Sequence, residues 1–370
     1  MSRRSAQHGS VTPAWVSADG PASDVVLSTR ARLARNVQGC PFPVRARDAH
    51  LKRVADLVLD AVHDSAGPTR RFGALRVIRP AHLSAAADRL ALVDIQVASR
   101  QHVDGGRYRP IVLNETGTLS LMVNEEDHLR LQCILPGLQP MTALQMAQEF
   151  DSFLAGKIEY ATSDNYGYLT SSLANIGTGL RLSVMLHLAG LSFLGEAVPA
   201  LTAAVELKVS VRGLFGEGTD AFGDILQVSN ETTIGFSEKE ITSRVRAAAE
   251  HLVSREREAR RKLAAERKSE LREAVEEAWA KLMEVRSLGG GETMAYLSVL
   301  RLGAELGLGP DLSAKAFSEL LVSMRLGMSA GGGRARESIT DDVKRAQLVR
   351  EKLIEECKGL QLAFPKELEQ

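Results

Sequence analysis

The sequence is poor in cysteine and has no excess of either charge. Its 370 residues include three cysteines, Cys40, Cys133 and Cys357, which lie far apart and form no CxxC or Cys/His pattern. This spacing argues against a disulfide framework or a structural zinc site, and it suits a reducing cytoplasm. Lys plus Arg and Asp plus Glu both number 46. Bulk attraction to nucleic acid or to acidic membranes therefore has no support.

Long apolar runs and the common nucleotide-binding fingerprints are also missing. No segment approaches the ~18 apolar residues that a membrane span needs. Arg3 and Arg4 are not followed by an apolar run, so no secretory signal is expected. There is no Walker A or Rossmann fingerprint, and Gly177-Thr178-Gly179 alone is a weak phosphate-loop signal. We expect a cytoplasmic protein, in which any anion site depends on local clustering of basic residues.

What is present suits a folded protein with more than one core. Hydrophobic residues make up 44% and charged residues 25% of the chain, as in ordinary globular proteins. A length of 370 residues favours two domains. We predict a flexible tail over 1–24, a first domain over 25–255 and a helical domain over 256–370. The expected fold class is α+β, an antiparallel sheet flanked by helices and followed by an all-α C-terminal domain.

Hydrophobic periodicity places the elements. Helical spacing predicts helices over 51–62, 85–95, 142–158, 292–306, 313–326 and 341–358. Ser237 and Glu240 form a capping box that begins another helix, and the charged stretch 254–284 after it is typical of a solvated helix. Alternation of period two predicts strands over 111–135 (with a turn near 115–117), 181–188, 205–212 and 224–229.

Arginines recur on the polar sides of these strands. Arg181, Ser183 and His187 alternate with apolar residues, as do Lys208 and Arg212 within 205–212. Further candidates for the polar face are Glu126, His128, Arg130 and Gln132 in one strand, and Arg30 with Arg32 near the N-terminus. If these strands are neighbours, the arginines form a polyphosphate site, because the planar guanidinium suits bidentate contact with phosphate.

Two other interpretations remain open from the residues alone. From periodicity alone, the arginine face fits a solvated sheet surface that carries Arg–Glu cross-strand pairs slightly better than a phosphate site. Glu126 lies in an acidic turn and Glu217 in a glycine-rich stretch, and each is a candidate catalytic carboxylate or an ordinary surface carboxylate.

Several motifs resemble the phosphagen (guanidino) kinase superfamily. Residues 27–36 (LSTRARLARN) resemble its nucleotide-binding opening, 124–130 (NEEDHLR) its acidic hallmark, and 167–181 its catalytic-cysteine segment. Residues 212–217, 227–230 and the helical last third are similar more narrowly to the bacterial protein-arginine kinases. The resemblance runs from about Val25 to Leu353.

The resemblance implies a kinase that uses ATP and Mg²⁺, with the metal carried by the nucleotide and no separate metal site. Glu126 and Glu217 would hold the acceptor guanidinium beside Ser172. The residues that would bind ATP are Ser28, Arg30, Arg32, Arg130, Arg181, Ser183, Val184, Met185, Arg212, Gly213 and Gly216. Asp342, Arg345 and Ala346 match a phosphoarginine-sensing motif.

The sequence departs from the family pattern at several positions. Ser172 stands where the family has a reactive cysteine, and Leu173 and Ala174 stand where Pro and Thr follow it. Gln96 replaces a histidine near the nucleotide site. Asp341 replaces the arginine that opens the sensing motif, and an acidic residue there would repel a phosphate.

Three functions are therefore weighed. The first is phosphorylation of arginine side chains in proteins, which marks them for Clp-type degradation. The second is a kinase for a small guanidino compound, and the third is a nucleotide-binding scaffold with weakened catalysis. The implied partners are arginine-containing proteins, an activator protein, a Clp-type unfoldase and a second copy of the chain through its helical domain, with neither nucleic acid nor membrane.

Overall fold

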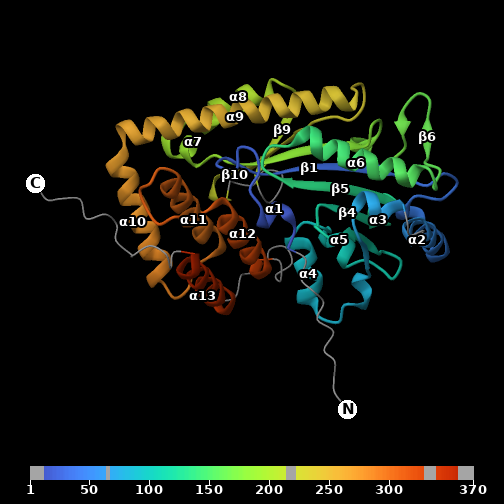
Figure 1. The fold of residues 1–370 in the computed structure, drawn as a ribbon, viewed down its shortest axis with the longest axis horizontal. Helices are drawn as coiled ribbons and strands as arrows, with labels where there is room; N and C mark the ends of the chain where they lie inside the picture. The colour runs from blue at the N-terminus through green and yellow to red at the C-terminus, as the bar shows by residue number, and fades with distance from the viewer. Residues whose placement is uncertain (1–11, 64–66, 214–221, 329–338, 357–370) are drawn as a thin grey trace, which may run out of the picture.

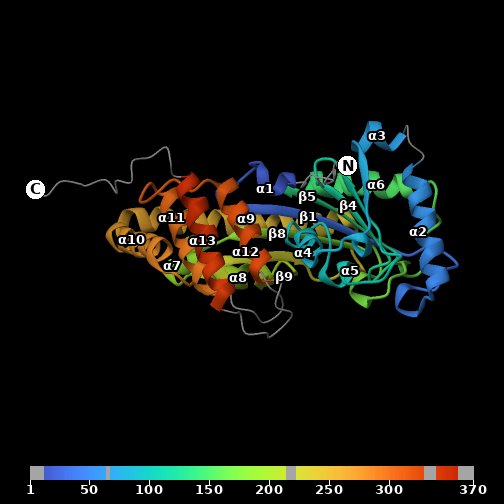
Figure 2. The same ribbon diagram turned by 90° about the horizontal axis from the view of Figure 1, so that it is seen from below.

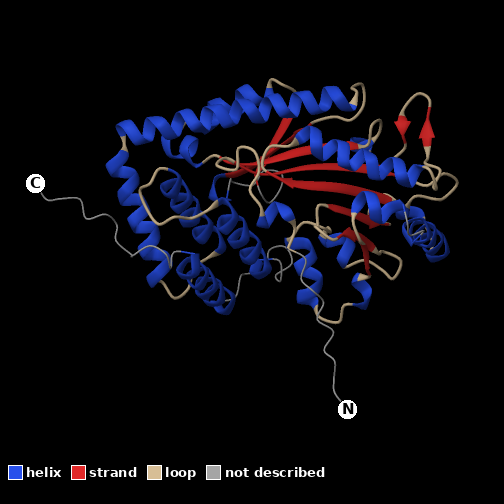
Figure 3. Ribbon diagram, viewed as in Figure 1, coloured by secondary structure: helices blue, strands red, loops and turns tan. Residues whose placement is uncertain are grey.

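A single antiparallel sheet organises the larger part of the protein. The computed structural model describes residues 12–63, 67–213, 222–328 and 339–356. Within this part, eight strands pair in the order β2-β3-β4-β5-β1-β8-β10-β9, and every neighbouring pair is antiparallel (Figure 3). The strands are β1 (Val26–Arg35), β2 (Leu75–Ile78), β3 (Ile111–Asn114), β4 (Leu119–Val123), β5 (Leu129–Pro136), β8 (Leu180–His187), β9 (Val209–Gly213) and β10 (Ile225–Asn230). A separate ribbon pairs β6 (Thr162–Ser163) with β7 (Gly167–Tyr168).

One face of the sheet is covered by two long helices. α6 (Pro140–Ala155) packs on β1 and β5, and α9 (Glu238–Glu266) packs on β8 and β10 (Figure 1). Apolar side chains at alternate strand positions, such as Leu131 and Leu182, form the main core with them. The other helices of the first part are α1 (Ala14–Ser17), α2 (Asp48–His63), α3 (Gly67–Phe72), α4 (Ala86–Asp94), α5 (Arg100–Val103), α7 (Ala189–Leu194) and α8 (Ala197–Val205).

The C-terminal helices cover only part of the opposite face (Figures 1 and 2). They are α10 (Lys268–Glu284), α11 (Gly290–Glu305), α12 (Ala314–Met328) and α13 (Ile339–Glu356). A second core joins them to the sheet through Leu27, Ile134, Met185 and Ile225. The face is therefore closed at this end. At its other end α4 contacts α12, and Gln96, which follows α4, contacts Arg30.

The predicted fold class is confirmed, and most predicted elements are present. The helices expected over 51–62, 85–95 and 142–158 are α2, α4 and α6. The capping box at Ser237 is formed, with Glu240 N donating to Ser237 Oγ and Glu240 Oε2 accepting from Ser237 N. No helix among the described residues combines the length and the apolar character that a membrane span needs.

Three local predictions are wrong. Residues 14–17 of the predicted flexible tail form α1, because Trp15 and Val16 bury their side chains in the second core. The strand predicted from Val205 begins at Val209, because α8 continues to Val205 and Lys208 turns the chain with a φ of 61°. His128 precedes β5 and is buried, with its ring hydrogen-bonded to Val37 N and Pro41 O.

The charged helix is less solvated than its composition indicates. Glu256 of α9 is fully buried and accepts hydrogen bonds from Gly190 N, Leu191 N and Arg260. Its carboxylate thereby satisfies the first backbone amides of α7, which a helix cannot satisfy by itself. α9 also runs without a break through residue 255, so the predicted domain boundary falls inside one helix.

Candidate functional site

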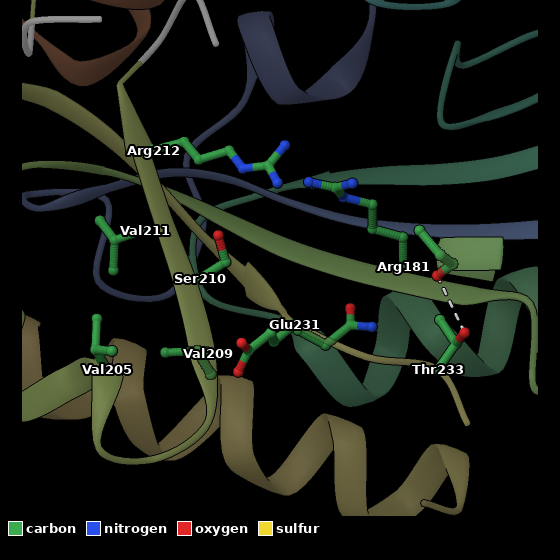
Figure 4. Close-up of a pocket in the computed structure, with 10 residues that line it drawn as sticks. Arg181, Val205, Val209, Ser210, Val211, Arg212, Glu231 and Thr233 are labelled. Carbon is green, nitrogen blue, oxygen red and sulfur yellow. Dashed lines mark hydrogen bonds between the residues drawn. The ribbon is translucent and has the colours of Figure 1, made fainter. Parts of the chain in front are cut away.

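Four arginines from four strands converge on the sheet face that the C-terminal helices partly cover. Strand register puts Arg32 of β1 directly opposite Arg181 of β8. Arg130 of β5 lies opposite Ala34, two residues along β1 and therefore on the same face. Arg212 lies on β9, which is separated from β8 by β10, and its side chain points to the same face as that of Arg181. The guanidinium groups of Arg181 and Arg212 point toward each other (Figure 4).

The cluster brings several positive charges together on one face of the sheet. Burial and the neighbouring charges of Arg130, Arg30 and Arg181 lower the pKa of Arg32, against the opposite effect of Glu125. Arginine keeps its proton at neutral pH in proteins, so the lowered pKa reflects first the burial of Arg32 and then its repulsion by the neighbouring arginines. An anion with several oxygens relieves such repulsion, and a triphosphate fits both the charge and the fork geometry of the donors.

One cluster member is held by a buried carboxylate. Glu125 Oε1 accepts from Arg130 Nη1 at 2.7 Å and from Ser99 Oγ at 2.6 Å, and Glu125 Oε2 accepts from Glu126 N at 3.0 Å. Burial raises the pKa of Glu125, but Arg130 and these hydrogen bonds outweigh it and lower the pKa to about 2. Glu125 thus stays ionised and fixes Arg130. Sequence reasoning missed this role, although the acidic run was visible.

Another member is supported by the segment after α4. Gln96 Oε1 accepts from Arg30 Nη1 at 3.2 Å, and Gln96 adopts a positive φ of 61°. Trp15 Nε1 donates to Ile95 O at 3.2 Å, which ties this turn to α1. Gln96, expected near the nucleotide site from the resemblance, is therefore in contact with a candidate phosphate-binding arginine.

The acidic turn between β4 and β5 presents the candidate acceptor carboxylate. Asn124 turns the chain with a φ of 60°, and its amide N donates to His128 O at 2.8 Å. Glu126 is half-buried at this turn. Burial and the nearby charges of Asp127 and Glu125 raise the pKa of Glu126, although Arg130 and Arg32 oppose the shift. A carboxylate with a raised pKa is a better proton acceptor.

A buried network joins this turn to the segment that carries Ser172. Asp127 Oδ1 accepts from Ser171 N at 2.6 Å and from Asn36 Nδ2 at 2.7 Å. Ser171 Oγ donates to Glu126 O at 2.8 Å. The positions of Glu126 and Ser172 are therefore linked through neighbours that sequence reasoning did not select. In the sequence, the only indication of this network was that a polar residue, Asp127 or Ser171, stands next to each candidate.

Two adjoining cavities contain these groups. The first, of about 220 Å³, is lined by Glu126 and Ser172 together with Arg32, Arg130 and Arg181. The second, of about 430 Å³, includes Arg212 and extends to the edge strand β9 (Figure 4). Arg181 and Ala174 line both cavities. Anion-binding and cation-binding side chains are thus brought to one continuous site.

The other ATP-binding and catalytic residues predicted from the sequence differ in where the structure places them. Ser28, Ser183 and Met185 face the same side as the arginines but are buried, near the second core. Val184 is not brought to the site by its side chain, which points into the main core on the opposite face because strand neighbours alternate. Gly213 ends β9 and is buried. Glu217 and Gly216 lie outside the described residues.

The sensing motif lies in α13, away from this cluster. Arg345 is buried and its Nη1 donates to Asp342 Oδ1 at 2.6 Å and to Leu288 O at 3.0 Å. Ala346 is also buried, in the second core. The side chain of Asp341 lies outside the described residues. The phosphoarginine-sensing role of Asp342, Arg345 and Ala346 stays a prediction.

Two family models and several named relatives match this chain. The family model "ATP:guanido phosphotransferase, C-terminal catalytic domain" matches residues 72–259, and "Protein-arginine kinase McsB C-terminal domain" matches residues 268–361. A protein-arginine kinase of Moorella thermoacetica is 38% identical over 92% of this chain and 97% of its own. One of Pelotomaculum thermopropionicum is 37% identical over 91% of this chain and 94% of its own.

Solved structures share the fold of the first part. Lombricine kinase is 22% identical with a TM-score of 0.56, over 66% of this chain and 69% of its own. The substrate-free duplicated taurocyamine kinase of Schistosoma mansoni is 26% identical with a TM-score of 0.52, over 62% of this chain. The chain spans 33% of the length of that duplicated kinase.

Proposed function

Because the chain belongs to the protein-arginine kinases of the ATP:guanido phosphotransferase family, we propose that it transfers the γ-phosphoryl group of ATP to arginine side chains of other proteins. The observation that carries this proposal is the convergence of Arg32, Arg130 and Arg181 in the cavity that also holds Glu126. Such a cavity offers charge neutralisation for phosphates and a carboxylate for a guanidinium.

The arginine cluster would act on the nucleotide by alignment and charge neutralisation. Phosphoryl transfer needs little covalent help from the protein, and positioning with electrostatic stabilisation provides most of the catalysis. Arg32, Arg130, Arg181 and Arg212 would hold the phosphate oxygens, with Arg30 beside them. The family implies ATP with a divalent metal, and we propose that Mg²⁺ accompanies the nucleotide and lowers the negative charge that the arginines must balance.

Glu126 would hold and activate the acceptor. The pKa of a guanidinium lies far above neutral pH, so the group is a poor nucleophile until one proton leaves. A carboxylate beside it holds the cation in line with the γ-phosphorus and accepts that proton. The raised pKa of Glu126 favours proton acceptance. Glu217 is proposed as the second carboxylate from the resemblance.

A labelled-phosphate assay tests the proposal. The protein is incubated with labelled ATP, with or without Mg²⁺, and with an arginine-rich protein or free arginine. We expect acid-labile label on the protein substrate, in the presence of Mg²⁺ only, and its loss in Glu126→Gln. Label on free arginine alone would favour a small-molecule guanidino kinase instead.

A scaffold with weakened catalysis is the second candidate, and Ser172 is the observation that favours it. A thiolate at this position would add negative charge beside the acceptor, whereas a hydroxyl stays neutral at pH 7. If neither substrate is labelled while ATP still binds, the scaffold function stands and the kinase function fails.

The wider setting is proposed from the family. We propose that the chain acts in the cytoplasm, forms a homodimer through its helical part and marks proteins for a Clp-type unfoldase, with an activator protein as a further partner. Sedimentation of the purified chain tests the dimer, and a Clp degradation assay with and without ATP pretreatment of the substrate tests the marking.

A further inference from the structure

We propose that the second cavity is a subsite for a lysine or arginine side chain that neighbours the target arginine in the substrate polypeptide, with Glu231 as its specificity-determining residue. The proposal rests on the proposed function and deepens it. It concerns which polypeptide segments are phosphorylated rather than the transfer step.

The composition of the cavity matches a long basic side chain. The residues that line it include Ala174 and Val205, which are apolar, and Glu231, which carries a carboxylate (Figure 4). Lysine and arginine have an apolar stem and a charged tip, so they cover apolar surface while the tip reaches a polar group. An aliphatic side chain in this cavity would form no ion pair with Glu231, and an acidic side chain would be repelled by it.

The carboxylate itself is available. Glu231 is exposed, and no ion pair joins it to any residue within the described ranges. Most exposed carboxylates have no function, so this alone decides nothing. What distinguishes Glu231 is that it lines a cavity that meets the acceptor site at Ala174 and Arg181.

The backbone that carries Glu231 is held on both sides. Before it, Asn230 Oδ1 accepts from Leu182 N at 2.8 Å and Asn230 Nδ2 donates to Leu180 O at 3.0 Å. After it, Thr233 Oγ1 donates to Ala174 O at 3.1 Å. Glu231 is therefore fixed relative to β8 and to the segment after Ser172, which a specificity-determining group requires.

Electrostatics adds a condition to the proposal. Arg181 and Arg212 lie at one end of the cavity, and their positive charges disfavour a second cation beside them. Once a triphosphate lies against the arginine cluster, the field of Glu231 dominates. The subsite should therefore favour a basic side chain only when nucleotide is bound.

Peptides with one target arginine test the subsite. Lysine is placed in turn at each flanking position in an otherwise neutral sequence, and norleucine at the same position preserves the stem without the charge. We expect kcat/KM of the wild type to be about three- to fivefold higher for lysine than for norleucine at one or two positions, the size of a partly exposed ion pair. Glu231→Gln should abolish that preference without changing KM for ATP or kcat for the norleucine peptides.

Charge reversal and a matched control sharpen the test. Glu231→Lys should prefer glutamate at the position where the wild type prefers lysine. Glu206→Gln removes another exposed carboxylate near Val205 that does not line the cavity, and it should keep the lysine preference. If Glu206→Gln abolishes the preference equally, or if Glu231→Gln retains it, the subsite assignment is wrong.

Equilibrium binding separates this inference from the proposed function. Fluorescence anisotropy of the same peptides is measured with the wild type and Glu231→Gln, with and without a non-hydrolysable ATP analogue. A lysine preference that needs both the analogue and Glu231 supports the subsite even if no phosphate is transferred, which would refute the kinase function alone. Equal binding of lysine and norleucine peptides in the presence of the analogue overturns the subsite.

Discussion

The two ends of β8 show how one sheet face becomes either a site or an interface. Arg181, Ser183, Met185 and His187 alternate along a single strand and point to the same side. Arg181 lines two cavities. His187, at the other end, is buried against Phe317, and its Nε2 is 2.8 Å from Ser298 Oγ.

The cause of the difference is what covers each end. α11 supplies Ser298, whose hydroxyl donates to Asp224 Oδ2 at 2.5 Å and lies 2.8 Å from His187 Nε2, while His187 Nδ1 has no hydrogen-bond partner among the described residues. At the open end like charges face each other instead. Substitutions at the open end should therefore change activity, and those at the covered end should change stability.

The largest effect is expected at Arg32. Arg32→Met removes one charge from the repelling cluster, so kcat/KM for ATP should fall about 10³-fold, the scale of a transition-state arginine. The melting temperature should stay the same or rise. Initial rates and thermal unfolding measure the two effects.

Arg35 is the matched control on the same strand. It points to the other face, where its Nη2 lies 2.8 Å from Asp151 Oδ2 in a buried ion pair. Arg35→Met should lower stability by about 3–5 kcal/mol, because the partner charge stays buried. A loss of stability in Arg32→Met as large as in Arg35→Met would contradict the comparison.

The next effect concerns Glu125 and pH. Its pKa falls from the ordinary 4.5 to about 2 on folding, so the carboxylate stabilises the fold fully above pH 4.5. That contribution, on the order of 3 kcal/mol, is lost as the pH falls from 4.5 toward 2. Urea unfolding from pH 5 downward should show a steeper loss for the wild type than for Glu125→Gln. Parallel pH profiles would show that Arg130 does not hold this carboxylate ionised.

A smaller effect is expected at the covered end. His187→Ala removes the hydrogen bond to Ser298 and the ring contact with Phe317, and should lower the free energy of unfolding by about 2 kcal/mol. The Michaelis constant for ATP should not change. Urea unfolding and ATP kinetics test both, with Ser298→Ala as the milder control. A selective fall in activity without a loss of stability would show that the covered end belongs to the site.

The smallest effect is expected from Ser172→Cys. Restoring a thiol beside the acceptor should raise kcat by up to about tenfold, which corresponds to about 1.4 kcal/mol of transition-state stabilisation. The gain should increase with pH as the thiol ionises. An unchanged kcat across the pH range would mean that Ser172 does not act on the acceptor.

Alternation along the strands predicted much of the sheet but could not predict its neighbours. Leu129, Leu131 and Cys133 are buried in the main core as the alternation indicates. The same pattern extended a strand back to Val205, although α8 ends at that residue and Lys208 turns the chain before β9 begins. No local pattern shows that Trp15 is buried, since its cover comes from helices almost three hundred residues later.

In the candidate site, too, the sequence predicted some features and not others. The arginines could be selected by residue type and strand face, although a solvated face with Arg–Glu pairs remained an alternative. Glu125 could not be separated from Glu126 in the sequence. One carboxylate has its pKa lowered and the other raised, because Arg130 and Ser99 contact only the first.

By itself the sequence determined the elements, the family and the residue types that meet a phosphate, since these depend on local periodicity and on motifs of a few residues. Tertiary structure alone decided which side chains share a cavity, which carboxylate is locked and which remains available, and which end of the arginine face is closed. Those properties arise from contacts between distant segments, and the charge and burial they create have no counterpart in the order of residues along the chain.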